Sequence, residues 1–247
     1  MFKTGQRVYL LPCNPVDVVQ GIPVRSSGDF AALTPDDVAA LSRSASSQQD
    51  SVIYVVAAFT GLRMGELRAL EWRDVDFGKR LVHVRHNYVD GVLGDPKSGK
   101  VRCVPMTDPV VGALDRLSQR GDFTSDADFV FCNQVAQHID NSALRRRFAK
   151  ALADAGLKRV RFHDLRHTFG TLAVQAFPLS DVKAFMGHAD ISTTMIYVHH
   201  VPQHDAANRL SRVIAGEGGL FPGFLARTAS SQLRPTPQGH DEQARPS

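Results

Sequence analysis

The sequence predicts an α+β protein that is mainly α-helical and carries one small antiparallel sheet of three strands. Along most of the chain, apolar residues recur three and four apart, as on the buried face of a helix. Only between Arg80 and Met106 does the spacing change towards two, which is typical of strands. With 247 residues, of which 43% are hydrophobic, the chain has ample material for a core.

The first helices are predicted from residues that start and end helices. Thr34 is suited to cap a helix whose first position is Pro35. A second helix is expected from Asp50 to Phe59, and because it is apolar on most sides we expect it to be central. Gly61 is expected to end it, and a short helix follows from Met64 to Leu70.

The sheet is predicted from three short segments. L-V-H-V-R-H alternates apolar and polar residues, and N-Y-V-D-G-V-L contains a D-G turn signal. The turn D-P-K-S-G-K then leads into V-R-C-V-P. Three antiparallel strands are the simplest arrangement of these segments.

Six further helices are predicted after the sheet, and Gly187 and Asp190 are their clearest stop and cap residues. In the second of the six, the arginines are expected to point away from the buried face. That face is made by Leu144, Phe148, Leu152 and Ala155. The six ranges are Pro109–Gln119, Asn141–Ala155, His163–Ala176, Ser180–Met186, Ile191–His199 and Pro202–Ala215.

Basic residues are concentrated in one part of a chain that is only mildly basic overall, with a net charge of +4 and an isoelectric point near 9.1. Between Ala143 and His167, eight Lys and Arg residues stand against two acidic residues. Such clustering is typical of a nucleic-acid-binding surface, although Arg145 to Lys150 alone also fit a solvated helix face. The candidate DNA-binding residues are Arg145, Arg146, Arg147, Lys150, Lys158, Arg159 and Arg161.

Composition argues against several classes of protein. The three cysteines are widely separated and form no C-x-x-C pair, so neither a disulfide framework nor a cysteine zinc site is expected. His200 and His204 are four apart but have no evident third ligand, so no metal site is predicted. There is no signal-peptide pattern and no apolar run near the ~18 residues that a membrane span needs. We therefore predict a cytoplasmic protein without a membrane partner.

The stretch from Phe162 to Tyr197 holds four side chains suited to phosphodiester chemistry. His163 and Arg166 are three apart, so on a helix they share one face. His188 and Tyr197 follow. A phenol that attacks phosphorus needs a general base, the leaving oxygen needs an acid, and arginines suit the charge on the non-bridging oxygens. Taken alone, Tyr197 is more simply a packing residue.

Three upstream residues are candidates for the functions that this stretch lacks. Arg63 is a candidate second arginine, and Glu66 is a candidate to orient it. Lys97, in the turn D-P-K-S-G-K, is a candidate proton donor. Each also has a simpler interpretation, namely a surface arginine after a helix-ending glycine, a solvated glutamate and a solubilising lysine.

Four segments resemble, in order, the motifs of the tyrosine recombinase (phage integrase) family. They are T-G-L-R-M-G-E-L, D-P-K-S-G-K-V-R-C-V-P, F-H-D-L-R-H-T and M-G-H-A-D-I-S-T-T-M-I-Y. The resemblance spans about Leu33 to Ile214. It implies the catalytic-domain fold of that family. It also implies an enzyme that cleaves and rejoins double-stranded DNA through a 3′-phosphotyrosine intermediate, with neither metal nor other cofactor.

On this resemblance, three side chains bind the scissile phosphate. Arg63 and Arg166 match the arginine pair that clamps it. His188 matches a position, histidine or tryptophan in the family, that hydrogen-bonds the phosphate. Glu66 matches a supporting acidic position.

The resemblance also implies how bonds and protons move. Tyr197 matches the nucleophile, and Lys97 matches the hairpin lysine that protonates the leaving 5′-oxygen. His163 matches the histidine that assists proton transfer to or from the tyrosine. For His167, which lies elsewhere on the same helix, a buried structural hydrogen bond is predicted instead.

The resemblance divides the chain into three parts. Residues 31–215 correspond to the catalytic domain, and residues 1–30 to a linker and the last trace of an upstream core-binding domain. Residues 216–247, rich in Gly, Pro, Ser and Gln, are expected to be disordered. Without the N-terminal domain, half of the clamp around DNA and much of the affinity are expected to be missing. The helix from Pro202 to Ala215 is expected to dock on a neighbouring subunit in a tetramer on DNA, or to fold back in cis.

Two alternatives to a site-specific recombinase remain open from the sequence. A truncated, catalytically impaired remnant of an integrase would bind DNA without cleaving it. A DNA-relaxing topoisomerase would use the same tyrosine chemistry without recombination. The family also suggests a directionality factor as a further partner.

Overall fold

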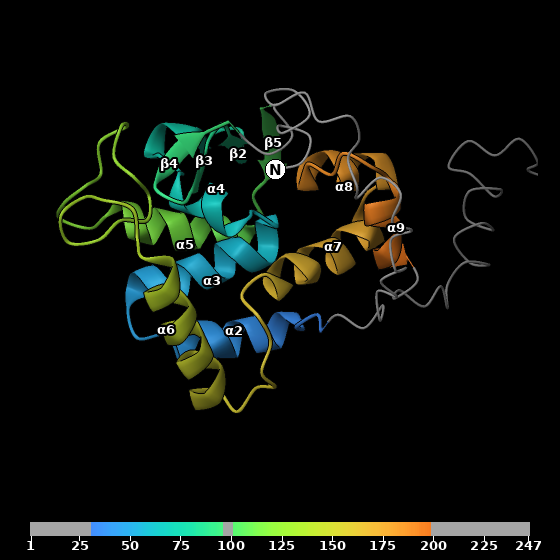
Figure 1. Cartoon of the computed structure of the whole chain (residues 1–247), viewed down its shortest axis with the longest axis horizontal. Coiled ribbons are helices and arrows are strands. Elements are labelled where there is room, and N and C mark those ends of the chain that lie inside the picture. The colour runs from blue at the N-terminus through green and yellow to red at the C-terminus, as the bar shows by residue number, and fades with distance from the viewer. Residues whose placement is uncertain (1–30, 96–100, 199–247) are drawn as a thin grey trace, which may run out of the picture. The chain divides into compact units, whose positions relative to one another are not determined.

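Helix α3 lies at the centre of the described part of the chain. A computed structural model describes residues 31–95 and 101–198 (Figure 1). α3 (Gln48–Thr60) begins at Ser47, whose side chain accepts a hydrogen bond from the backbone N–H of Asp50 at 3.1 Å. It ends at Gly61, whose φ of 65° is left-handed, so the predicted stop is confirmed.

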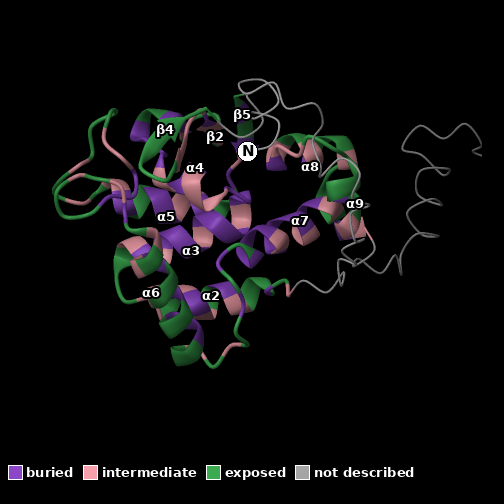
Figure 2. Ribbon diagram, viewed as in Figure 1, coloured by how far each residue is buried: buried purple, intermediate pink, exposed green. Residues whose placement is uncertain are grey.

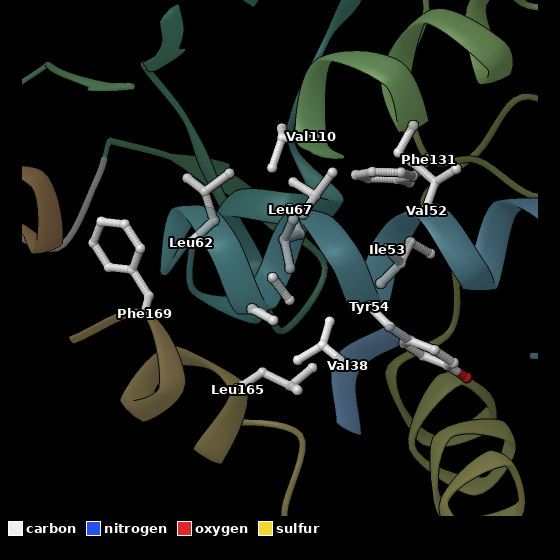
Figure 3. Close-up of a cluster of buried hydrophobic side chains, with 14 of the residues drawn as sticks. Val38, Val52, Ile53, Tyr54, Leu62, Leu67, Val110, Phe131, Leu165 and Phe169 are labelled. Atoms are coloured by element: carbon white, nitrogen blue, oxygen red, sulfur yellow. The ribbon is translucent and has the colours of Figure 1, made fainter. Parts of the chain in front are cut away.

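Three helices pack against α3: α2 (Pro35–Arg43), α5 (Asp108–Ser118) and α7 (Asp164–Ala176). Figure 2 shows that α3 is buried along most of its length. In Figure 3, Leu165 and Phe169 approach from one side, and Val110 and Phe131 lie on the other. Each large apolar side chain contributes about 1.5–3 kcal/mol when fully buried, so this cluster is a main source of stability. The predicted central position of this helix is confirmed.

The start of α2 is fixed by its own cap and by a contact with α7. Thr34 Oγ1 accepts a hydrogen bond from the backbone N–H of Asp37 at 3.1 Å, and Asp37 Oδ2 accepts one from the N–H of Thr34 at 2.9 Å. The N–H of Leu33 donates to Thr168 Oγ1 at 2.9 Å. The predicted cap is confirmed, and the bond from Leu33 ties the start of α2 to the helix that carries Arg166.

A three-stranded antiparallel sheet is present, as predicted, although one of its strands is not the expected one. β2 (Leu81–Val84) lies between β1 (Val75–Asp76) and β5 (Arg102–Pro105). The segment N-Y-V-D-G-V-L, expected to be one of its strands, instead forms a separate hairpin of β3 (Asn87–Val89) and β4 (Val92–Gly94).

The turn chemistry explains why that hairpin is separate. Asp90 and Gly91 both have positive φ, 51° and 82°, which is the geometry of a tight two-residue turn. The turn pairs β3 with β4, and β3 also packs against α4 (Met64–Arg68). The D-G signal is therefore confirmed as a turn.

The remaining helices agree with their predicted ranges to within a few residues. Gly187 ends α8 (Leu179–Met186) with a φ of 60°, and Asp190 Oδ1 accepts a hydrogen bond from the N–H of Ser192 at 2.9 Å. The predicted segments 1–30, 202–215 and 216–247 lie outside the described residues. Within the described residues no helix is long and apolar enough to cross a membrane. The elements not yet introduced are the 3₁₀ helix η1 (Trp72–Asp74), α6 (Asn141–Asp154) and α9 (Ser192–Val198).

Candidate active site

Arg166, in the first turn of α7, is buried with its guanidinium on two backbone carbonyls. Only 3% of the residue is exposed. Nη1 donates to the carbonyl of Gly61, at the end of α3, and Nη2 donates to that of Met186, at the end of α8. Burial and the nearby charge of Arg63 lower the pKa of Arg166 to about 9. The guanidinium therefore stays positive at neutral pH and is held between two helix ends.

Arg63 lies directly before α4 and reaches the same end of α8. Its Nη2 donates to the carbonyl of Gly187 at 3.1 Å, and its Nη1 donates to Glu66 Oε1 at 2.9 Å. Its backbone N–H donates to Glu66 Oε2 at 2.7 Å. The structure thus brings the two predicted arginines together, and Glu66 orients Arg63 rather than facing water.

Glu66 is charged although it is almost completely buried, at 2% exposure. Burial alone would raise its pKa, but hydrogen bonds and charge from Arg102, together with Arg63, outweigh burial and lower the pKa to about 2. Arg102 Nη1 and Nη2 donate to the two carboxylate oxygens at 2.9 and 2.7 Å. A two-bond pair of this kind fixes the plane of the carboxylate.

Arg102 was not among the predicted site residues. It lies in β5, where the burial alternates so that Arg102 and Val104 face inward and Cys103 faces outward. In the sequence, Arg102 and Val104 are two apart and so share one face of the predicted strand. That shared face was the available signal, because an arginine on the buried face of a strand needs a carboxylate partner. The partner lies 36 positions away, which local reasoning does not reach.

His188 follows Gly187 and lies beside the arginines. Its Nδ1 and the Thr194 hydroxyl of α9 are 2.9 Å apart. Burial, the charge of Arg166 and that of Arg63 lower the pKa of His188 to about 3, so the ring is neutral at physiological pH. A neutral imidazole with one nitrogen held by Thr194 can direct the other towards a ligand.

Tyr197 lies on α9 with its ring against α7. Its centroid is 6.5 Å from that of His188, with the two rings nearly parallel. A Cβ at Gly170 would lie 2.5 Å from Tyr197 Cζ, so the close approach of this ring requires glycine there. Burial raises the pKa of Tyr197 to about 12, against the opposing charges of Arg166 and Arg63.

His167 contacts the hydroxyl of Tyr197, a contact that the sequence did not predict. Its Nδ1 lies 3.0 Å from the Tyr197 hydroxyl. Burial, together with the charge of the neighbouring His163, lowers the pKa of His167 to about 4, so it is neutral at physiological pH. The predicted structural hydrogen bond therefore exists, and its partner is the candidate nucleophile itself.

His163 occupies the N-cap position of α7, without a capping hydrogen bond from its side chain, and it is exposed whereas His167 and His188 are half-buried. Desolvation of its ring and the charge of Arg166 lower its pKa, while Asp164 acts in the opposite direction. Its ring meets that of His167 edge-on, with centroids 5.6 Å apart. Lys97, the remaining predicted catalytic residue, lies outside the described residues.

Three of the predicted DNA-binding residues line a cleft whose lining also includes His163. The cleft has a volume of about 530 Å³, and Arg145, Arg159 and Arg161 contribute to its lining together with Phe148. Arg161 also pairs with Asp164 at 2.9 Å. The exposed residues Arg146, Lys150 and Lys158 lie on α6 and in the segment between α6 and α7.

Arg147 differs from its predicted orientation. We expected the arginines of this helix to point away from the protein. Instead Arg147 Nε and Nη2 donate to the two carboxylate oxygens of Asp50 at 2.6 and 3.0 Å. Asp50 is 1% exposed, and a buried carboxylate needs such a partner. The guanidinium therefore joins α6 to α3.

Among residues 31–95 and 101–198, no group of three or more His, Cys, Asp or Glu residues is arranged to hold a metal ion. His200 and His204 lie outside this part of the chain. The described site contains two arginines, a buried carboxylate with its own arginine, three histidines and a phenol.

Two curated relatives are similar to this chain in sequence. A XerC-like tyrosine recombinase of Caldanaerobacter subterraneus subsp. tengcongensis is 25% identical over 227 residues, covering 81% of this chain and 56% of the relative. Tyrosine recombinase XerC of Xanthomonas campestris pv. campestris (strain B100) is 37% identical over 147 residues, covering 59% of this chain and 42% of the relative. The chain spans about half the length of these relatives.

Two solved structures are similar in fold. The Tn1549 transposon integrase in complex with a circular intermediate DNA has a TM-score of 0.64 and 25% identity, covering 86% of this chain and 75% of that one. The XerA recombinase has a TM-score of 0.58 and 29% identity, covering 76% of this chain and 65% of that one. The predicted mainly helical, recombinase-like fold is confirmed.

The family model described as the phage integrase family matches residues 32–204, which is well over half of the sequence. The match includes every described residue of the candidate site, from Arg63 to Tyr197. The chain belongs to the phage integrase family.

Proposed function

We propose that this chain is a site-specific recombinase that cleaves and rejoins DNA strands through a covalent bond to Tyr197. One observation carries the proposal: Arg63, Arg166 and His188 converge at the end of α8, and the ring of Tyr197 lies beside them. Two guanidiniums with a neutral imidazole suit the negative charge of a phosphodiester in its transition state. The similar proteins named above are recombinases and an integrase, which supports the same function.

In the proposed cleavage step, the Tyr197 oxygen forms a bond to phosphorus while the bond from phosphorus to the 5′-oxygen breaks. The phenol proton passes to a neutral histidine, for which His163 is the family assignment and the hydrogen bond of His167 supports a share. Lys97 is the proposed donor of a proton to the leaving 5′-oxygen. The exchange conserves one phosphoester bond, so the reverse reaction rejoins a strand.

The partners and location of the protein follow from this function. The substrate is double-stranded DNA, held in part by the basic cleft beside His163. Assembly as a tetramer through the segment 202–215 concerns residues outside the described part and remains a prediction. An accessory directionality factor is a further predicted partner. The proposed location is the cytoplasm, with which DNA as the substrate is consistent.

The proposal is tested with nicked DNA duplexes that carry a randomised central segment. A nick beside the cleavage point releases the 5′-hydroxyl, so a covalent adduct accumulates. After denaturation in detergent, DNA that remains attached to protein is sequenced. We expect the full chain to capture a defined sequence and the Tyr197→Phe variant to capture none.

Three outcomes would contradict the proposal in different ways. An adduct that persists in Tyr197→Phe would remove Tyr197 as the nucleophile. Salt-sensitive binding without any adduct would favour a non-catalytic DNA-binding remnant. Relaxation of supercoiled plasmid without exchange of strands would favour a topoisomerase.

A further inference from the structure

Three arginines from three different elements donate hydrogen bonds to three consecutive backbone carbonyls, those of residues 185–187. Arg102 Nε, from β5, donates to the first at 2.8 Å. Arg166 Nη2, from α7, donates to the second, and Arg63 Nη2, from the start of α4, donates to the third at 3.1 Å. We call these acceptors the α8 carbonyls.

The α8 carbonyls attract cations for a general reason. The last carbonyls of a helix lack partners within the helix and carry the negative end of its dipole. Gly187 adopts a left-handed φ of 60°, which ends α8 at this point. A Cβ there would approach the Arg102 side chain to 3.2 Å, so glycine also makes room for Arg102.

Arg102 and Arg63 compete for one carboxylate. Arg102 binds both oxygens of Glu66, which leaves Arg63 with one side-chain bond to Oε1 at 2.9 Å. Because Arg63 is not drawn fully onto Glu66, its Nη2 remains on the carbonyl of Gly187. Arg63 is 23% exposed at its side chain, whereas that of Arg102 is 8% exposed, so Arg63 is the arginine that faces a ligand.

Charge leads to the same conclusion. Arg63, Arg102 and Arg166 carry three positive charges against the single negative charge of Glu66. If Arg102 were absent, Glu66 would pair with Arg63 alone and neutralise much of the charge that a phosphate would meet. An arginine that binds Glu66 on both oxygens therefore keeps Arg63 available as a cation.

We propose that Arg102 is a positioning residue: it occupies Glu66 so that the Arg63 guanidinium stays on the α8 carbonyls and directed at the scissile phosphate. This inference rests on the proposed function, because it assumes that Arg63 binds phosphate. Arg102 itself does not touch the substrate. Its effect is transmitted through Glu66 and through the carbonyl of residue 185.

The first test compares cleavage and binding by Arg102→Met, Arg102→Lys and a matched control. Arg85→Met is the control, because Arg85 also pairs with a buried carboxylate, that of Asp74 at 2.8 Å, but lies outside the site. On the captured nicked duplex we expect Arg102→Met to lower the single-turnover cleavage rate roughly 10- to 100-fold, less than the direct loss of a charge-stabilising donor. DNA affinity should change less than about threefold, because it is the sum of contacts to many phosphates. Arg102→Lys should be intermediate, and Arg85→Met should cleave at the wild-type rate.

A second variant separates positioning from a loss of folding. In Glu66→Gln/Arg102→Met the carboxylate charge that would capture Arg63 is gone, so this double variant should cleave faster than Arg102→Met alone. The inference is overturned if Arg102→Met cleaves at the wild-type rate, if Arg85→Met loses as much, or if the double variant brings no recovery.

A crystal structure of Arg102→Met, or of Arg102→Lys if the first variant does not fold, tests the inference without any DNA. We expect both Arg63 Nη atoms on Glu66 and no bond to the carbonyl of Gly187. An unmoved Arg63 would overturn the inference even if cleavage were slower. Conversely, failure of the wild-type chain to form any adduct contradicts the proposed function, while this crystallographic result still decides the role of Arg102.

Discussion

Glu66 shows how one residue sets the geometry of the arginines. A charge buried in this way gives little net stability, because desolvation offsets the attraction, but its removal leaves the opposite charges uncompensated. We expect Glu66→Gln to lower the free energy of unfolding by about 3–5 kcal/mol, since Arg102 would then be a buried cation with no carboxylate. Urea denaturation measures the change. A loss below about 1 kcal/mol would mean that the neutral amide satisfies both arginines.

His167 is the second residue whose contact has a direct consequence for chemistry. If its Nδ1 accepts the phenol proton of Tyr197, His167→Ala should slow single-turnover cleavage about 100-fold, within the range of general base catalysis. His163→Ala is the comparison, measured over the same range of pH. If only His163→Ala slows the reaction, His167 does not accept the proton and only positions the ring of Tyr197.

Gly170 links the helix α7 to the position of Tyr197 on α9. We expect Gly170→Ala to displace the tyrosine ring, because a Cβ would lie 2.5 Å from Cζ, and therefore to reduce adduct formation and lower stability by about 1–3 kcal/mol. The matched control is Gly112→Ala on α5, where the nearest atom would be at 3.5 Å. In a helix that change should stabilise by about 0.5–1 kcal/mol. Thermal unfolding and the covalent adduct assay measure both variants; equal behaviour would contradict the close packing.

The secondary structure elements were predictable where their ends are set by local chemistry. Thr34, Gly61 and Gly187 act through hydrogen bonds or backbone angles within a few residues, so their positions could be predicted from the sequence. Strand β1 could not be predicted as a partner of β2. Its two residues, Val75 and Asp76, are too few to show an alternation of apolar and polar residues, and their pairing with β2 depends on the fold. The same limit separates Arg166, found through H-x-x-R, from Arg102, whose partner Glu66 is distant in sequence.

The interaction between His167 and Tyr197 is a further case beyond the reach of the sequence pattern. The sequence predicted a structural hydrogen bond for His167, and the family resemblance implied the role of Tyr197. Their contact depends on α9 packing across α7 at Gly170, a tertiary feature that no local pattern encodes. The predicted hydrogen bond of His167 is present, but the sequence did not identify Tyr197 as its partner.

At the scale of the whole molecule, two half-buried histidines and a buried glutamate make stability depend on pH. The pKa values of His167 and His188, about 4 and 3, lie below their usual 6.5, and that of Glu66, about 2, lies below 4.5. The folded state binds these protons more weakly than the unfolded state does. The stability that these three groups contribute is therefore complete above pH 6.5 and is lost as the pH falls towards their pKa values in the folded state.

We therefore expect the thermal midpoint to fall between neutral pH and about pH 4, by roughly 2–4 °C for each kcal/mol lost. His188→Asn should flatten the pH profile, because Asn keeps a polar group near Thr194 and does not titrate. His86→Asn, outside the site, serves as the control. A profile of His188→Asn as steep as that of the wild type would contradict the assignment.

The basic cleft should govern the salt dependence of DNA binding by the molecule as a whole. Each phosphate contact contributes about 0.9 to the slope of log affinity against log salt. Arg159→Ala and Arg145→Ala should each reduce that slope by about one, with little effect on stability. Arg147→Ala should leave the salt slope unchanged and lower the stability, because its guanidinium is paired with the buried carboxylate of Asp50. Filter binding over a series of salt concentrations distinguishes the two groups.

The α8 carbonyls have a consequence for how the chain tolerates mutation. A main-chain oxygen cannot be removed by substitution, so most side-chain replacements at positions 185 and 186 leave the acceptors of Arg102 and Arg166 in place. A change of length is different, because one residue inserted into α8 turns every later carbonyl by about 100°. Random mutagenesis should therefore recover active variants with new side chains on the last turn of α8, and none with a residue gained or lost there.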